Sequence, residues 1–134
     1  MSLLITFPDV MLHATTMLRA ALAARTEDYA DGVTVGTIMP RDGDIPFVMV
    51  RQEGQTIAQR VDAEATVRVS VWHTSEARAL ALAGLCQALM LAHVGDGEVR
   101  LYSPVSGPFP ASDPDNGNPI ASFTVAARLR PITL

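Results

Sequence analysis

The sequence contains no lysine, and its ten basic residues are all arginine. Because fourteen residues are acidic, the formal net charge is −4, which argues against a protein that binds nucleic acid through a basic face. Codon bias of a GC-rich genome explains the arginine preference most simply. The alternative is that arginine is preferred because it makes bidentate contacts at interfaces.

Cysteine is nearly absent as well, since Cys86 is the only one and no intrachain disulfide can form. It lies in an apolar run, which favours a core residue over a reactive thiol. The N-terminus lacks the basic segment and long apolar run of a signal peptide. The apolar run at 79–94 is too short and too rich in alanine for a membrane span. We expect no membrane contact, and a protein kept in the cytoplasm or built into a particle there.

Catalytic motifs are missing too. His13, His73 and His93 are scattered along the chain, and no neighbouring cysteine or carboxylate cluster completes a zinc site. No glycine-rich phosphate loop occurs. Residues 113–124 resemble a calcium loop, but the fifth position is glycine and the twelfth is Thr124 instead of glutamate. The sequence therefore predicts a non-enzyme with no catalytic residue, no metal and no cofactor, and gives His93 a structural role.

The composition is that of one globular domain covering residues 1–134. Apolar residues make up 49% of the chain and charged residues 18%, which argues against disorder. A chain of 134 residues can bury a proper core but is too short for two domains.

The strongest local signal is the segment 66–94. Residues 66–73 alternate, with Val67, Val69 and Val71 on one face, which predicts a half-buried strand. Thr74 or Ser75 can then cap a helix whose body is apolar nearly all round. Such a helix must be covered on most sides, by a second helix or by another subunit.

The rest of the pattern predicts an α+β domain, a mainly antiparallel sheet of four to five strands with two helices packed on one face. Thr6 is the expected cap of the first helix. Strands 33–39 and 47–51 are expected to pair antiparallel, with a tight turn at 53–55. The expected elements are a helix at 8–25, strands at 33–39, 47–51, 56–60, 98–103 and 121–130, and a long loop at 103–119 that holds five of the nine prolines.

Two features suggest interactions with partners. The loop 103–119 carries Phe109 between two prolines, which could anchor in a partner's pocket or fold back as a lid on its own sheet. The polar face of the strands is rich in arginine and aromatic residues, which favours an interface over an ordinary solvated face. That face is predicted to hold Arg68, Trp72, Arg100, Tyr102, Arg128 and Arg130.

The order of these elements resembles that of the tail terminator proteins of long-tailed (siphovirus-type) bacteriophages, particularly those that infect GC-rich actinobacteria. The likeness covers about residues 33–130 and depends on the order of a proline-containing hairpin, an alanine-rich helix and a loop with Asp-Pro-Asp. Neck and head-completion proteins of the same phages look similar. The stretches that carry it are VTVGTIMPRDGDIPFVMVRQEG, VDAEATVRVSVWHTSEARALALA and VRLYSPVSGPFPASDPDNGNPIASFTVAARLR.

The resemblance implies a structural virion protein. Tail terminators form a ring, typically hexameric, that caps the tail tube, ends its polymerisation and joins the tail to the head. The implied partners are other copies of the chain, the tail-tube protein and the neck protein. DNA passes through the channel without specific binding, and assembly takes place in the host cytoplasm. A head-closure or neck component is the alternative, followed by a small ligand-binding domain.

A ring places interface residues on the loops and on the polar strand face. These positions are inferred from the pattern and are not taken from a family site. The loop 103–119 and the loop that spans Arg41 and Asp44 are expected at ring ends or between subunits. The predicted interface residues are Arg41, Asp44, Arg68, Trp72, Arg100, Phe109, Arg128 and Arg130.

Overall fold

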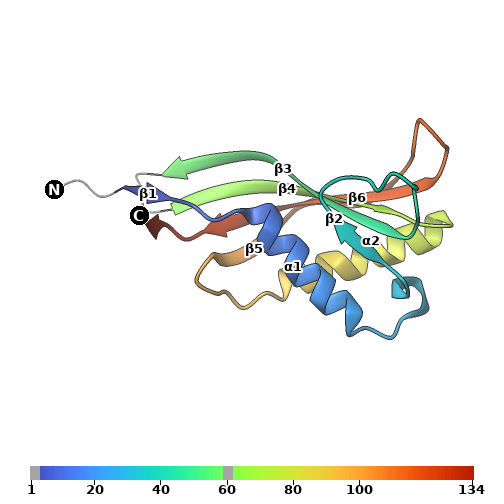
Figure 1. Ribbon diagram of the computed structural model, residues 1–134, viewed down its shortest axis with the longest axis horizontal. Helices are drawn as coiled ribbons and strands as arrows, with labels where there is room; N and C mark the ends of the chain where they lie inside the picture. The colour runs from blue at the N-terminus through green and yellow to red at the C-terminus, as the bar shows by residue number, and fades with distance from the viewer. Residues whose placement is uncertain (1–3, 59–61) are drawn as a thin grey trace.

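The computed structural model describes residues 4–58 and 62–134, and it confirms the α+β prediction (Figure 1). A five-stranded sheet has the order β2-β3-β4-β6-β5, and β1 pairs with β7 in a separate two-stranded ladder. Neither helix of the described residues has the length and apolar character needed to cross a membrane. The elements are β1 (Ile5–Thr6), α1 (Val10–Ala23), a short 3-10 helix (Asp28–Ala30), β2 (Thr34–Gly36), β3 (Phe47–Ala58), β4 (Asp62–Trp72), α2 (Glu76–Leu91), β5 (Val99–Ser112), β6 (Pro119–Leu129) and β7 (Ile132–Thr133).

Both helices pack on the same face of the sheet (Figure 1). Helix α1 lies over β2 and β3, whereas α2 lies over β4, β5 and β6, and the two helices also contact each other. The valines that alternate along β4 and the side chains of Phe123 and Val125 on β6 are fully buried beneath them. The apolar sides of α2 are therefore covered largely within the chain, and Leu91 is its one exposed large apolar residue among those described.

Capping residues explain where the helices begin. Ser75 accepts from the backbone N–H of Arg78 at 3.2 Å and caps α2, as predicted. The predicted cap of α1 is wrong, because Asp9 accepts from the N–H of Leu12 at 3.1 Å and fills that role. Thr6 cannot serve there, since its backbone belongs to β1 and pairs with Ile132.

The pairing of β2 differs from the prediction. β2 is only three residues long and runs parallel to β3, with Thr34 opposite Phe47. A strand this short spans only about 10 Å, so the loop 37–46 can bring the chain back to its starting end without a crossover helix. The expected antiparallel hairpin between 33–39 and 47–51 is therefore wrong.

Strand β3 continues through the expected tight turn at 53–55. Gly54 pairs with Thr66, and the register shifts between Gln52 and Gly54. A bulge inserts one residue into a strand and breaks the two-residue pattern, which makes a continuous strand look like a turn in the sequence. The last two positions of the expected strand 56–60 lie outside the described residues.

Strand β5 replaces most of the expected loop 103–119, so that prediction is wrong. β5 runs to Ser112 and pairs with β6, and the connecting turn is confined to residues 113–118. Three of the prolines fall within this strand. Because β5 is the outer strand of the sheet, a proline's missing N–H can face away from the ladder at no cost. The register shifts three times along it.

Cys86 is fully buried in α2, where burial raises the pKa of its thiol to about 12. At pH 8 we expect native protein to react with iodoacetamide roughly a thousandfold more slowly than unfolded protein, because the thiolate is the reacting form. Mass spectrometry of timed samples measures this rate, and the same protein in urea is the control. Rapid stoichiometric labelling of the native chain would contradict the expectation.

Candidate functional site

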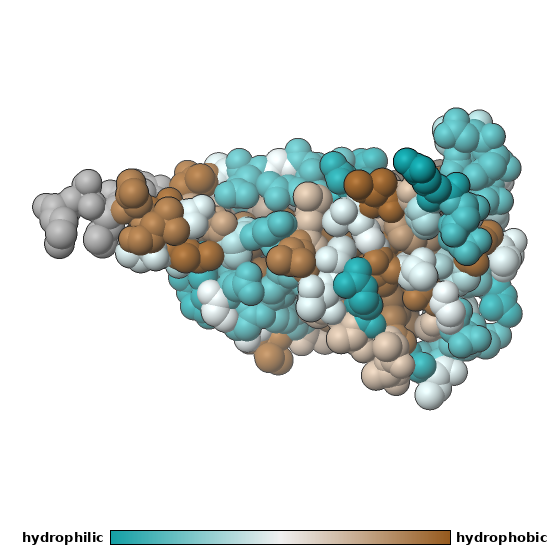
Figure 2. Space-filling model, in the orientation of Figure 1, coloured by the Kyte–Doolittle hydropathy of each residue, from teal (hydrophilic) through white to brown (hydrophobic). Residues whose placement is uncertain are grey.

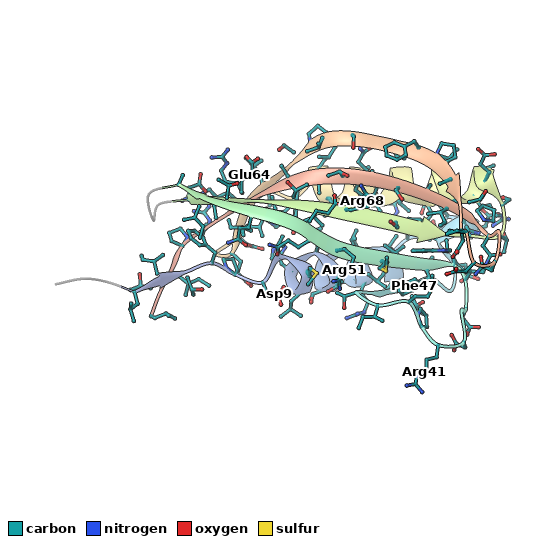
Figure 3. The ribbon with its side chains drawn as sticks, turned by 90° about the horizontal axis from the view of Figure 1, so that it is seen from above. Asp9, Arg41, Phe47, Arg51, Glu64 and Arg68 are labelled. Atoms are coloured by element: carbon teal, nitrogen blue, oxygen red, sulfur yellow. The ribbon has the colours of Figure 1, made fainter. Side chains whose placement is uncertain are left out.

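The face of the sheet opposite the helices is open (Figure 3). Its centre is formed by small side chains on the paired strands β4 and β6. Ser122 Oγ donates to Ser70 Oγ at 3.1 Å, and Thr124 and Ala126 lie beside them with little exposed area. These small, uncharged side chains, Ser70, Ser122, Thr124 and Ala126, form what is called the small-residue strip below.

Arg68 and Arg128 lie on this open face, as predicted, but both are paired within the chain. Arg68 contacts Glu53 at 3.3 Å, so the pair links β4 to β3. Arg128 contacts Asp62 at 2.5 Å and Glu64 at 3.4 Å, so it links β6 to β4. Both arginine side chains remain about half exposed, and a guanidinium carries five N–H donors, so both can still donate to a partner's acceptors.

Trp72 also lies on the open face, yet it is buried. Its ring packs on Phe47 with the ring centroids 6.1 Å apart, and its Nε1 donates to Asp113 Oδ2 at 2.8 Å. Hydrogen bonds from the backbone N–H of Asp115 and from Trp72 lower the pKa of Asp113. Trp72 therefore anchors the turn between β5 and β6, and does not present the exposed aromatic surface that was expected.

The other members of the predicted polar face lie elsewhere. The register shift between Val99 and Leu101 turns Tyr102 onto the helix face, where it is 4% exposed. Arg100 lies within that shift and is half-buried. Arg130 follows the end of β6 and donates from Nε to the backbone oxygen of Asp96 at 2.5 Å. The alternation of the sequence does not reveal this bulge in β5, so residues that were predicted on one face lie on different sides of the sheet.

The predicted loop residues are exposed. Arg41 projects away from the body in the loop between β2 and β3 (Figure 3), and Asp44 is exposed in the same loop. Phe109 is 48% exposed and lies opposite Ser122 on the open face. Phe109 is therefore a strand residue next to the small-residue strip, and no loop carries it as a lid.

The outer half of β3 is an exposed edge that the sequence pattern does not reveal. β2 pairs only with residues 47–49, so no described strand borders residues 50–58 on that side. From Arg51 onward every residue of β3 is half-buried or exposed, and none is proline. This strand edge, residues 50–58 of β3, is named the open edge below.

Exposed apolar side chains gather near the far end of the open edge. The end of β3 and the β1–β7 ladder lie at the same end of the molecule (Figure 1). Figure 2 shows hydrophobic side chains at this end. Leu134 donates from its backbone N–H to Leu4 at 2.9 Å, which holds the two terminal segments together. The exposed apolar residues are Leu4, Ile57, Ile132 and Leu134.

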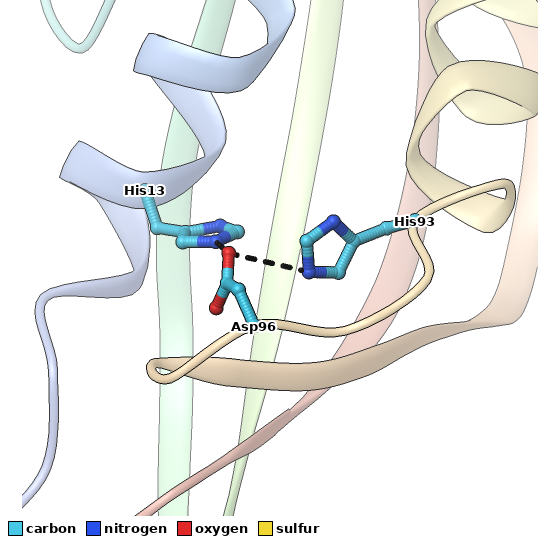
Figure 4. A group of neighbouring side chains, drawn as sticks. All are labelled: His13, His93 and Asp96. Carbon is cyan, nitrogen blue, oxygen red and sulfur yellow. Dashed lines mark hydrogen bonds and ion pairs between the residues drawn. The ribbon is translucent and has the colours of Figure 1, made fainter.

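A second group that the sequence spacing does not reveal lies on the helix side (Figure 4). His13 in α1 and His93 after α2 are far apart in the chain, but both approach Asp96 in the turn before β5. Asp96 Oδ2 lies 2.6 Å from His13 Nε2 and 3.5 Å from His93 Nε2. His13 Nδ1 lies 2.6 Å from the Tyr102 hydroxyl. Among the described residues, His13, His93 and Asp96 form a group of donors that could hold a metal ion.

The electrostatics of this group keep Asp96 charged and Tyr102 neutral. Desolvation raises the pKa of Asp96, but hydrogen bonds from His13 and from the N–H groups of Val99 and Glu98 outweigh it, so the pKa falls well below its usual range. Burial, with the charges of Asp96 and Glu98, raises the pKa of Tyr102.

Comparisons of the chain with protein-family models and with curated proteins find no match.

Proposed function

We propose that this chain is the subunit of a ring that caps the tail tube of a long-tailed phage and joins the tail to the head. The observation that carries the proposal is the open edge of β3, which ends among exposed apolar side chains. The resemblance of residues 33–130 to tail terminators supports the same role. The protein would then act through contacts with other subunits in the virion.

An unpaired strand edge favours association with another chain, because its outward N–H and C=O groups can pair with a further strand. The open edge lacks proline, which is one of the usual means of blocking such pairing. At the opposite side of the sheet, β5 is interrupted by Pro104, Pro108 and Pro110 and by three register shifts. The two edges therefore differ in their capacity to pair.

This difference favours a ring over a symmetric dimer. If the open edge binds a different surface of the next subunit, each contact is head-to-tail, and repeated head-to-tail contacts close into a ring when the rotation permits. The small-residue strip, with the exposed Phe109 beside it, would stack on the tube or the neck. Arg41 and Asp44 would lie on a projecting loop at a ring end.

The charge of the chain suits a channel for DNA. The net charge is −4, and a wall of this sign does not hold phosphates in place. DNA would pass through without specific binding. The tail-tube protein and the neck protein would be the partners at the two ends of the ring.

Light scattering after gel filtration, with negative-stain images of the same peak, tests the proposal. We expect a hexameric ring with a central hole, or a monomer that assembles when tail-tube protein is added and then limits tube length. Tubes of unlimited length in the presence of excess protein would contradict the terminator role. If the protein binds neck protein and does not bind tail-tube protein, it is a head-closure or neck component instead.

A further inference from the structure

The three converging side chains of the helix side point to a metal site that is independent of the proposed ring. His13, His93 and Asp96 each offer one ligand atom, and these three atoms lie within 4.8 Å of one another. We propose that these residues bind one Zn²⁺ ion, which ties helix α1 to the turn between α2 and β5. Two imidazoles and one carboxylate form a ligand set that suits zinc.

The spacing of the ligand atoms is close to what zinc needs. Bonds of about 2.0–2.2 Å in tetrahedral geometry place neighbouring ligand atoms about 3.3–3.5 Å apart. The 3.5 Å between His93 Nε2 and Asp96 Oδ2 already fits. The 2.6 Å between His13 Nε2 and Asp96 Oδ2 must open by less than about 1 Å, which a rotation of the Asp96 carboxylate can supply.

Each ligand except His93 is oriented by a second partner. Asp96 Oδ1 accepts from the N–H groups of Glu98 and Val99, both at 2.8 Å, which leaves Oδ2 directed toward the histidines. With zinc on Nε2, the Nδ1–H of His13 donates to the Tyr102 hydroxyl, at the 2.6 Å already present. Partners of this kind fix the tautomer and orientation of ligands at metal sites.

His93 is held less firmly. Its Nε2 lies 3.2 Å from the backbone oxygen of Val99, and a bound ion would replace that hydrogen bond. His93 follows the end of α2, where its N–H donates to the oxygen of Met90 at 3.1 Å, so the backbone position of the ligand is set by the helix end.

The environment permits an ion to enter. The side chains of His13 and His93 are only 8% and 12% exposed, whereas that of Asp96 is 44% exposed. A hollow of about 400 Å³ opens beside His13 and Asp96 and is also lined by Met17 and Glu98. Three protein ligands leave one position of a tetrahedron for a water molecule, which this hollow can supply.

Isothermal titration of the full-length protein with ZnCl₂, after removal of metals with EDTA and without a histidine tag, tests the site. We expect one Zn²⁺ per chain, and no comparable binding of Mg²⁺, which prefers oxygen ligands. Co²⁺ is expected to bind in the same place with the visible absorption of a tetrahedral ion. The variants His93→Gln and Asp96→Asn should weaken binding of Zn²⁺ by at least tenfold.

Two further variants separate a metal site from a simple hydrogen-bond network. Tyr102→Phe keeps the buried ring but removes the partner of His13, and should weaken binding about tenfold. Asp113→Asn is the matched control, because Asp113 also lies in a turn and accepts a backbone N–H through Oδ1, and it is outside the His13, His93 and Asp96 group of the described residues. It should bind as the wild type does.

The proposal is overturned if the wild type takes up no stoichiometric Zn²⁺, or if Asp96→Asn and His93→Gln bind it as tightly as Asp113→Asn does. Circular dichroism confirms that each variant is folded, and Tyr102→Phe serves as the test if a ligand variant is not. Binding is measured on the free subunit, so a failure of ring assembly does not affect this result.

Discussion

The substitution Ile57→Asp is expected to abolish ring assembly and leave a folded monomer. Ile57 is 57% exposed near the end of the open edge, so the fold itself should lose only about 1 kcal/mol, the span of strand preferences. In the proposed ring the same side chain would lie in a contact that is repeated around the whole assembly. A carboxylate buried there without a partner costs several kcal/mol in each contact. Light scattering and negative-stain images measure the result directly.

Val94→Asp is the matched control, since Val94 is 97% exposed in the turn between α2 and β5. It introduces the same charge at an apolar, exposed position away from the open edge, and should leave assembly unchanged. Rings formed by Ile57→Asp would show that the end of β3 is not an interface. Loss of rings in both variants would assign the effect to net charge.

The segment from β4 to α2 could be predicted because its signals are local. Val67, Val69 and Val71 alternate without interruption, and Ser75 stands one residue before the helix begins. Period-two alternation and a capping hydroxyl act over a few residues, so neighbours in the chain carry the information.

The pairing of the remaining strands depends on contacts that are remote in the chain. β2 is parallel to β3 because the loop 37–46 returns along it, and nothing in residues 34–36 records that direction. The prolines of β5 indicate a loop when only local preference is considered. They are accommodated in a strand because β5 occupies the edge of the sheet, which the tertiary structure decides.

Candidate site residues could likewise be placed from the sequence where local signals suffice, and could not where remote contacts decide. Arg68 and Arg128 were correctly placed on one face, because regular alternation holds along β4 and β6. Tyr102 was predicted on the same face, but the bulge after Val99 shifts the alternation of β5 by one residue and turns its side chain toward the helices. His13 contacts Asp96 only because α1 packs beside the turn after α2, and no spacing in the sequence predicts that packing.

Gly107→Ala is expected to destabilise the fold by about 2–4 kcal/mol, the sum of backbone strain and overpacking. The φ angle of Gly107 is +80°, a region that alanine rarely adopts. A Cβ at this position would also lie 2.5 Å from the backbone oxygen of Ser122 and 3.0 Å from Phe123 Cα. Neither of these backbone atoms can move without shifting β6.

Urea denaturation measures the effect, and Gly54→Ala is the control. Gly54 also lies at a register shift near a sheet edge, but a Cβ there would meet no atom within 4 Å. Its variant should therefore unfold at nearly the wild-type midpoint. Equal midpoints for Gly107→Ala and the wild type would show that β5 can move away from β6 at this point. Because α2 also donates from Gln87 Nε2 to the Gly107 oxygen at 3.3 Å, such a movement would have to shift the strand away from the helix as well.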